Sequence, residues 1–342
     1  MYLLRFCMVF TILGTMNGPE KPVDPSMQAM NELVIAFGSC NHEYEEQPMW
    51  AAMLKQEPDL WIWLGDNIYG DTDNMDTLKY KYQQQRSNPG YKHFRNSVEI
   101  IGIWDDHDYG INDGGAGYRQ KTESQQHFLD FIGEPDHTLR RKQAGIYTSY
   151  MKEVGDLQVK IILLDTRYHR DTLFKKKRAY LPNEEGDILG GQQWQWLEKQ
   201  LKTSKADVNI IASSIQVIPE QHAYEKWANF PNARQRLFNL VAESKARGVL
   251  FLSGDRHIAE FSKIELSSPN YPLYDLTSSG LTHTWRRASR ERNKYRTGPL
   301  LVELNYGLLH IRKVQGKTTV EASVRGLNDN LYFKELISFP TP

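Results

Sequence analysis

The chain has 342 residues, of which 40% are hydrophobic and 25% are charged, and its 42 basic residues balance its 42 acidic ones. A chain of this length suits one large domain or two smaller ones. The zero net charge argues against the clustered excess of basic charge that binding to nucleic acids or anionic membranes requires. The one basic run, residues 175–178, is most simply explained as a solvated loop.

The N-terminus differs in composition from the rest of the chain. A short apolar run at residues 6–13 follows Arg5 and precedes small residues, which is typical of a secretory signal peptide. The run is too short to span a bilayer. We therefore expect residues 1–18 to direct export to the periplasm or the medium (or to remain as an uncleaved anchor), residues 19–30 to be a linker and residues 31–342 to form one domain.

The two cysteines are Cys7 and Cys40. Because Cys7 lies within the expected signal peptide, its removal would leave Cys40 alone, and no intrachain disulfide could then form. A thiolate is a good metal ligand. A free cysteine is also common as a small buried hydrophobic residue, so both interpretations stay open at this point.

Helices and strands alternate over the first two thirds of the expected domain. Strands, most of them continuous apolar runs typical of strands covered on both faces, are predicted at residues 33–37, 60–64, 98–104, 146–151, 159–164, 208–212 and 249–252. Helices are predicted at residues 47–57, 75–96, 119–132, 189–202 and 232–247. Strand–helix–strand units predict parallel crossovers, which place the carboxyl ends of the strands at the same edge of a sheet.

The last third of the chain predicts a β meander instead. Short alternating strands are expected at residues 261–266, 273–277, 300–305, 308–312, 318–324 and 331–336.

Four of the apolar strands end in side chains that can bind metals. The first strand precedes Cys40, and the second precedes Asp66 and Tyr69. Residues 105–108 (Asp-Asp-His-Asp) follow the third, and residues 255–257 (Asp-Arg-His) follow the strand at 249–252. An aspartate at a strand end can simply cap a turn, so each motif alone is weak. Four ionisable groups in a row, however, crowd like charges unless a cation lies nearby.

Taken together, these strand ends predict a site for two cations. Thiolate, phenolate and imidazole suit a softer or trivalent ion, and carboxylate oxygens suit a hard one. Two-metal sites of this kind hydrolyse phosphate esters, because the metals activate a water and stabilise both the attacking and the leaving oxygen.

Five segments, in consistent order over residues 33–285, resemble the alkaline phosphatase D (PhoD-like) family of calcineurin-like metallophosphoesterases. They are residues 37–40 (Phe-Gly-Ser-Cys), 65–69 (Gly-Asp-Asn-Ile-Tyr), 104–108 (Trp-Asp-Asp-His-Asp), 189–197 and 254–257 (Gly-Asp-Arg-His). The resemblance implies a four-layer α/β/β/α sandwich. It also implies hydrolysis of phosphate monoesters, diesters or both by a metal-bound hydroxide, without a covalent phosphoenzyme.

The resemblance further implies a metal ligand set. Cys40, Tyr69 and His257 would bind a ferric ion, and Asp66 would bridge this ion to a second metal, calcium. Asp106 and Asp255 would complete the calcium site. Zinc or manganese stays an alternative to these ions.

Several further residues have implied or open roles. Asp105 is the alternative to Asp106 as calcium ligand. Asn112 is a candidate for the calcium shell or for contact with the substrate, or it makes a turn contact before residues 113–115. Gln216 and His283 follow predicted strands, and the sequence leaves their contribution to the site open.

The catalytic residues are implied by the same resemblance. His107 would face the leaving group as proton donor or phosphate ligand, and Asp108 would orient it. Arg167 would hold the phosphate through paired hydrogen bonds, although an ion pair with Asp165 or a neighbour explains it as well.

The expected substrate is a small phosphate ester or a phospholipid, with no nucleic-acid partner. A phospholipase-type phosphodiesterase is therefore one alternative function. A metal-binding interaction protein without activity is another, and the presence of every implied ligand argues against it.

Overall fold

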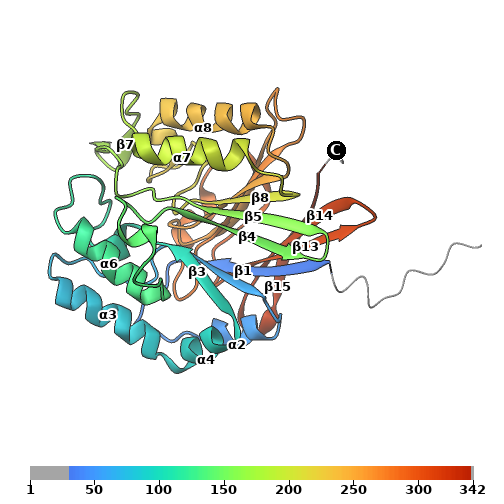
Figure 1. Ribbon diagram of the computed structural model, residues 1–342. Coiled ribbons are helices and arrows are strands. Elements are labelled where there is room, and N and C mark those ends of the chain that lie inside the picture. Colours follow the sequence, from blue (N-terminus) through green and yellow to red (C-terminus); the bar gives the residue numbers. More distant parts are fainter. Residues whose placement is uncertain (1–30, 340–342) are drawn as a thin grey trace, which may run out of the picture.

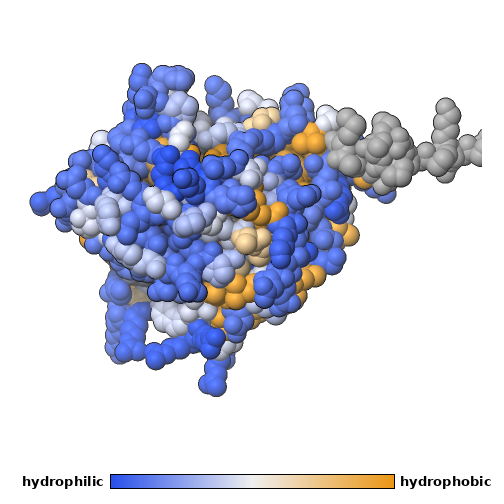
Figure 2. Space-filling model, turned by 90° about the horizontal axis from the view of Figure 1, so that it is seen from below, coloured by the Kyte–Doolittle hydropathy of each residue, from blue (hydrophilic) through white to orange (hydrophobic). Residues whose placement is uncertain are grey.

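The computed structural model describes residues 31–339 (Figure 1). The predicted signal peptide and linker, residues 1–18 and 19–30, lie outside this range. Over the described range, no helix is both long and apolar enough to cross a membrane. The face that Figure 2 shows is mainly hydrophilic and carries several apolar patches.

Two sheets pack against each other at the centre of the molecule. The first consists, in spatial order, of β15 (Leu331–Ser338), β14 (Lys317–Arg325), β13 (Tyr306–Val314), β1 (Glu32–Gly38), β2 (Leu60–Leu64) and β3 (Glu99–Ile103). The second consists of β12 (Arg296–Leu301), β10 (Ala259–Ile264), β11 (Leu273–Ser278), β9 (Val249–Ser253), β8 (Val208–Ala212), β5 (Leu157–Leu163) and β4 (Thr148–Val154).

Helices cover the outer face of each sheet (Figure 1). The first sheet is covered by α2 (Met49–Leu54), α3 (Met75–Ser87), α4 (Pro89–Ser97) and α6 (Lys121–Ile132), and the second by α7 (Gly190–Lys202) and α8 (Pro231–Ser244). The predicted four-layer α/β/β/α sandwich is thus confirmed. The short elements are α5 (Asp106–Tyr109), the hairpin of β6 (Phe174–Lys176) and β7 (Ala179–Leu181), and the 3-10 helices η1 (Leu139–Arg141), η2 (Trp227–Asn229), η3 (Arg286–Arg290) and η4 (Leu327–Asp329).

The strands that precede the predicted site run parallel. In the first sheet β2 pairs in parallel with both β1 and β3. In the second sheet β5, β8, β9 and β11 form a parallel series. The carboxyl ends of neighbouring strands therefore lie at a common edge, as the strand–helix–strand pattern predicts.

Three predictions about the elements need correction. The single helix predicted at residues 75–96 is divided at Asn88, which caps the second helix, because Pro89 cannot continue the first. The last third is not one meander: β10 to β12 complete the second sheet, whereas β13 pairs with β1 in the first. The strand predicted at residues 300–305 lies at Arg296–Leu301, where it pairs with β10.

Tryptophans join β2 to the helices that cover it. Trp61 and Trp63 lie on the same side of the strand and are fully buried. The ring of Trp50 in α2 lies 5.3 Å from Trp61 and 5.4 Å from Trp63, in edge-to-face geometry. Such aromatic pairs add about 0.5–1.5 kcal/mol each to the burial of their surface. They fix β2, and with it the loop that starts at Gly65.

Gly65 ends β2 in a conformation that favours glycine. Its φ is +96°, and a Cβ built on it would lie 2.4 Å from the Cβ of Asp105. The absence of a side chain therefore lets the loops after β2 and β3 meet. This approach brings Asp66 and Asp106 to the same place.

We expect Gly65→Ala to lower the free energy of unfolding by about 2–4 kcal/mol, through backbone strain and overpacking against Asp105. Urea denaturation followed by circular dichroism measures this change. Gly117→Ala is the matched control, because a Cβ there has no neighbour within 4 Å. Equal stability of the two variants would contradict the steric explanation.

Candidate metal centre

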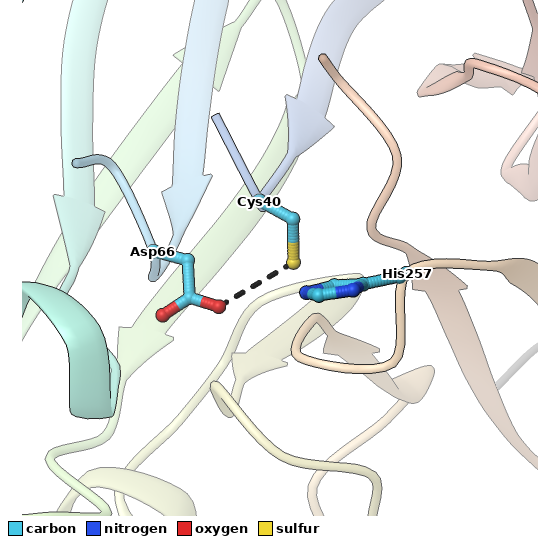
Figure 3. Close-up of side chains that lie close together, drawn as sticks. All are labelled: Cys40, Asp66 and His257. Carbon is cyan, nitrogen blue, oxygen red and sulfur yellow. Dashed lines mark hydrogen bonds between the residues drawn. The ribbon is translucent and has the colours of Figure 1, made fainter. Parts of the chain in front are cut away.

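Three side chains from three strand ends converge on one point (Figure 3). Cys40 follows β1, Asp66 follows β2 and His257 follows β9. The Sγ of Cys40 lies 3.5 Å from Oδ2 of Asp66. Ligand atoms of all three lie within 4.8 Å of one another, a spacing that a single metal ion can bridge.

Tyr69 joins this cluster together with an additional histidine. Its hydroxyl lies 3.1 Å from Nε2 of His257 and 2.9 Å from Nε2 of His283. His42 stacks on the Tyr69 ring, with centroids 5.1 Å apart. The loop that carries His283 is tied to Cys40, because the amide of Thr282 donates to the Cys40 carbonyl at 3.3 Å.

A second, carboxylate-rich cluster adjoins the first. Asp66 also groups with Asp106 and His107, and Asp106 groups with Asp105 and Asp255. Asp66 is therefore common to both clusters, which is the position that a bridging ligand requires. The fold thus brings all six predicted metal ligands close together at the ends of the strands.

Two further carboxylates belong to the second cluster. Asp113 and Glu225 group with Asp106 at metal-binding distance. Sequence reasoning did not single out Glu225, because it lies in a loop of irregular structure between β8 and α8 and follows no strand. The Gly114-Gly115 pair predicted a turn there, and nothing in the sequence indicated that the carboxylate of Asp113 belongs to the site.

The chemistry of the donor set fits two cations. Asp66 Oδ1 and Asp105 Oδ2 are buried and have no hydrogen-bond partner among the described residues, whereas Glu225 Oε1 pairs with Nε of Arg170 at 3.0 Å. Burial raises the pKa values of Cys40 and Asp66 well above their usual range, and neighbouring carboxylates act in the same direction. Buried anions of this kind need compensating charge. Thiol, phenol and imidazole on one side and oxygens alone on the other suit ions of different hardness.

The carboxylate that contacts His107 is Asp71, and Asp108 does not. The Nδ1 of His107 lies 2.7 Å from Oδ2 of Asp71. Burial alone would lower the pKa of His107, but Asp66 and Asp106, with the hydrogen bond that the imidazole donates to Asp71, raise it to about 11. The expectation that Asp108 contacts His107 is therefore corrected: the imidazole contacts Asp71, a carboxylate in the loop after β2 to which the sequence assigned no role.

Asp108 instead holds the two loops of the site together. Its fully buried carboxylate accepts hydrogen bonds from the backbone amides of Asp105 at 2.6 Å and Asp66 at 3.1 Å. It also accepts from Nδ2 of Asn67 at 2.5 Å. One side chain thus joins the segment after β2 to the segment after β3.

Arg167 is buried beneath the carboxylate cluster. Its Nε donates to Oδ1 of Asp105 and its Nη1 to Oε2 of Glu225, each at 2.5 Å. Its side chain is 0% exposed. Of the two explanations left open by the sequence, this geometry favours the ion pair, with Asp105 and Glu225 rather than Asp165 as partners.

The site opens into a cavity of about 750 Å³. Asp106, His107 and His257 line it, as does the exposed Asn112. Gln216 does not line it: its Nε2 donates to Glu260 at 2.9 Å and to Thr277 at 2.8 Å. Its Oε1 is buried without a partner among the described residues.

Comparisons with known proteins agree with this architecture. A family model described as PhoD-like phosphatase matches residues 35–297. Alkaline phosphatase D of Bacillus subtilis (strain 168) is 24% identical over 288 residues, which cover 69% of this chain and 47% of that protein. The chain thus spans about half the length of this curated relative. A solved structure of PhoD is similar with a TM-score of 0.73 at 18% identity, over 90% of this chain and 68% of that one.

We expect Asp71→Asn to lower the pKa of His107 in the metal-free protein, because the neutral amide stabilises the imidazolium less than the carboxylate does. Titration of the imidazole by NMR measures this shift. The folded-state pKa of about 11 lies above the usual value, so the stabilisation by the charged imidazole is complete below about pH 6.5 and is lost as the pH rises toward 11. Asp73→Asn is the control, and an unchanged pKa in Asp71→Asn would contradict the assignment.

Arg167→Gln is expected to destabilise the fold by about 3–5 kcal/mol, because it leaves buried carboxylates unpaired. Urea denaturation of the metal-free protein measures this loss. The exposed Arg292 provides the control variant Arg292→Gln, with an expected effect within about 0.5 kcal/mol. Unchanged stability combined with a raised KM would instead favour a direct contact of Arg167 with phosphate.

Proposed function

Because this chain belongs to the PhoD-like phosphatase family, we propose that it hydrolyses phosphate esters at the strand-end clusters described above. The observation that carries the proposal is the position of Asp66, which lies in both the thiol–imidazole cluster and the carboxylate cluster. A shared carboxylate between a mixed ligand set and an oxygen ligand set suits a pair of unlike cations.

The proposed first ion is ferric iron, held by Cys40, Tyr69, His257 and Asp66. Thiolate and phenolate favour a trivalent ion, and burial disfavours both anions without one, since it raises the pKa of Cys40 and of Tyr69. Zinc or manganese would accept most of the same ligands.

The proposed second ion is calcium, held by Asp66, Asp106 and Asp255. Asp113 and Glu225 lie close enough to contribute further oxygens, as calcium takes six to eight of them. Together the two ions would supply a hydroxide nucleophile from water at neutral pH and would offset the charge on the phosphate oxygens.

His107 is proposed to serve the leaving group. Asp71 occupies its Nδ1, so Nε2 is the nitrogen left to donate a proton to the leaving oxygen. His107 lines the cavity, where an ester held at the clusters would place its alcohol. Asp71 is thus a positioning residue that holds the imidazole and keeps it protonated.

Asp108 and Arg167 are proposed to hold other residues of the site in position. Asp108 fixes the backbone that carries Asp66 and Asp106, and Arg167 fixes Asp105 and Glu225. Neither side chain is needed at the phosphate itself. Monoesters, diesters and phospholipid headgroups all present the same phosphate to these ligands, so the walls of the cavity would determine which of them is hydrolysed.

The first experiment measures metal content and the visible spectrum of protein purified without chelator. One iron and one calcium per chain are expected, with a charge-transfer band that Tyr69→Phe abolishes. Tyr80→Phe is the control, since Tyr80 is 56% exposed on α3, outside both clusters. A colourless protein without bound metal would contradict the proposed pair of metal ions and would favour an interaction protein without enzymatic activity.

Hydrolysis is then compared for p-nitrophenyl phosphate and bis(p-nitrophenyl) phosphate. Asp66→Asn is expected to lower kcat/KM for the preferred ester by about 10³-fold or more, because several kcal/mol of transition-state stabilisation depend on both ions. Full activity of Asp66→Asn would overturn the proposal.

A further inference from the structure

The basic run at residues 175–178 is exposed, as expected of a solvated segment, but it forms part of a β-hairpin beside the candidate metal centre rather than a loop. Its strands β6 and β7 pair through three residues each, and the turn between them contains Lys177, with a φ of +57°. Three of the four basic residues, Lys175, Lys177 and Arg178, line the same cavity as the metal clusters. Lys176 does not line it.

Contacts of β7 hold the hairpin beside the cavity. The amide of Tyr180 donates to the carbonyl of Ala223 at 3.2 Å, and its hydroxyl donates to the Asp113 carboxylate. Lys175 Nζ donates to the Tyr180 hydroxyl at 3.3 Å. The basic side chains are thus carried by a docked element whose place relative to the carboxylate cluster is defined.

A fourth cation lies on the cavity wall contributed by η3. Arg287 is exposed and lines the cavity. We name the set of Lys175, Lys177, Arg178 and Arg287 the basic rim. Across residues 31–339, none of these four side chains forms an ion pair within the chain. Arg256 also lines the cavity but is already paired with Glu291, at 2.6 Å.

The carboxylates of the same cavity are engaged elsewhere. Asp106, Asp113, Glu225 and Asp255 are the acidic residues of its lining, and all four belong to the metal-binding groups. Once cations neutralise them, four positive charges remain at the mouth with no anion opposite. Lysine and arginine in this state are strong partners for phosphate.

Aromatic side chains line the same cavity as the basic rim. Tyr180, Tyr224 and Trp285 line the cavity, and the rings of Tyr224 and Trp285 are 4.9 Å apart. The guanidinium of Arg256 lies over the Tyr224 ring, 4.2 Å from its centroid, so the rings of Tyr180 and Trp285 are the ones that offer apolar surface to the carbon skeleton of a ligand. The cavity lining therefore combines metal-binding carboxylates, aromatic rings and the cations of the basic rim.

We propose that the basic rim binds a second phosphate group of the substrate, so that the preferred substrates are phosphate esters whose alcohol carries another phosphate. This inference rests on the proposed function, because it takes the first phosphate to lie at the metal clusters. The competing explanation is that the rim cations only balance the acidic clusters through space. That explanation predicts no preference between an ester with one phosphate and the same ester with two.

The test compares alkanediol monophosphates with the matching bisphosphates, using butanediol, hexanediol and octanediol to vary the spacing between the phosphates. The metal-loaded wild-type protein is expected to prefer one bisphosphate by roughly tenfold or more in kcat/KM, mainly through KM, and to lose this preference as the salt concentration is raised. In the triple variant K175Q/K177Q/R178Q and in R287Q, the ratio of kcat/KM for the bisphosphate to kcat/KM for the monophosphate is expected to fall toward one.

Two matched control variants distinguish the effect of where a basic residue lies from the effect of the net charge of the protein. Lys176→Gln removes a charge from the same hairpin, and Arg286→Gln removes one next to Arg287, but neither residue lines the cavity. Both are expected to keep the preference for the bisphosphate. An equal loss in these controls, or a wild-type ratio near one at every spacing, would overturn the proposal.

A protein that hydrolyses none of these esters would refute the proposed function rather than the basic rim. Isothermal titration calorimetry with the same monophosphates and bisphosphates then decides the matter. Tighter binding of a bisphosphate that the triple variant loses would support the rim, and equal binding of both ligands by the wild-type protein would overturn it.

Discussion

Buried negative charge at the ends of parallel strands is the constraint on which the rest of this structure depends. Asp66, Asp105 and Asp255 lie in one small volume, and burial together with the neighbouring carboxylates raises the pKa of each. Such a group of anions persists only with positive charge close by. The chain supplies part of it through Arg167 from below and His107 from the cavity side, and bound cations are proposed to supply the remainder.

The consecutive residues 105–108 show how one short segment meets this constraint. Asp105 turns toward Arg167, Asp106 joins the metal-binding groups and His107 turns to Asp71 at the cavity. Asp108 folds back on the loops that carry the others. Four adjacent polar residues therefore have four separate environments, because α5 begins within the run and rotates each side chain by about 100° from the last.

Local patterns in the sequence predicted the parallel strands and the convergence of their ends, whereas the two-sheet, four-layer architecture was implied by the resemblance to the PhoD-like family. Apolar runs marked the strands, and parallel pairing then placed Cys40 and Asp66 at one edge of the first sheet and Asp255 at the carboxyl end of β9 in the second sheet. Partners supplied by loops were beyond this reasoning: Asp71, Glu225 and the docking of the basic hairpin depend on how loops fold over the edge, which no periodicity encodes. The ion pair of Arg167 could not be predicted without knowing that Glu225 is buried beside it. The division of the last third of the chain between the two sheets depended on which sheet offered an unpaired edge strand to β13.

The pairing of β13 with β1 has a consequence for the order of events during synthesis. The first strand of the domain lies between β2 and a strand that begins at Tyr306, and Phe37 packs where Gly307 leaves space for its ring. The loop after Cys40 is likewise tied to Thr282. A nascent chain that has not yet emerged past residue 314 thus has an incomplete first sheet, and the surroundings of its thiol are unfinished. Completion of the first sheet and of the surroundings of Cys40 is therefore a late step of folding, since contacts of such sequence separation form only once the distant strand is available.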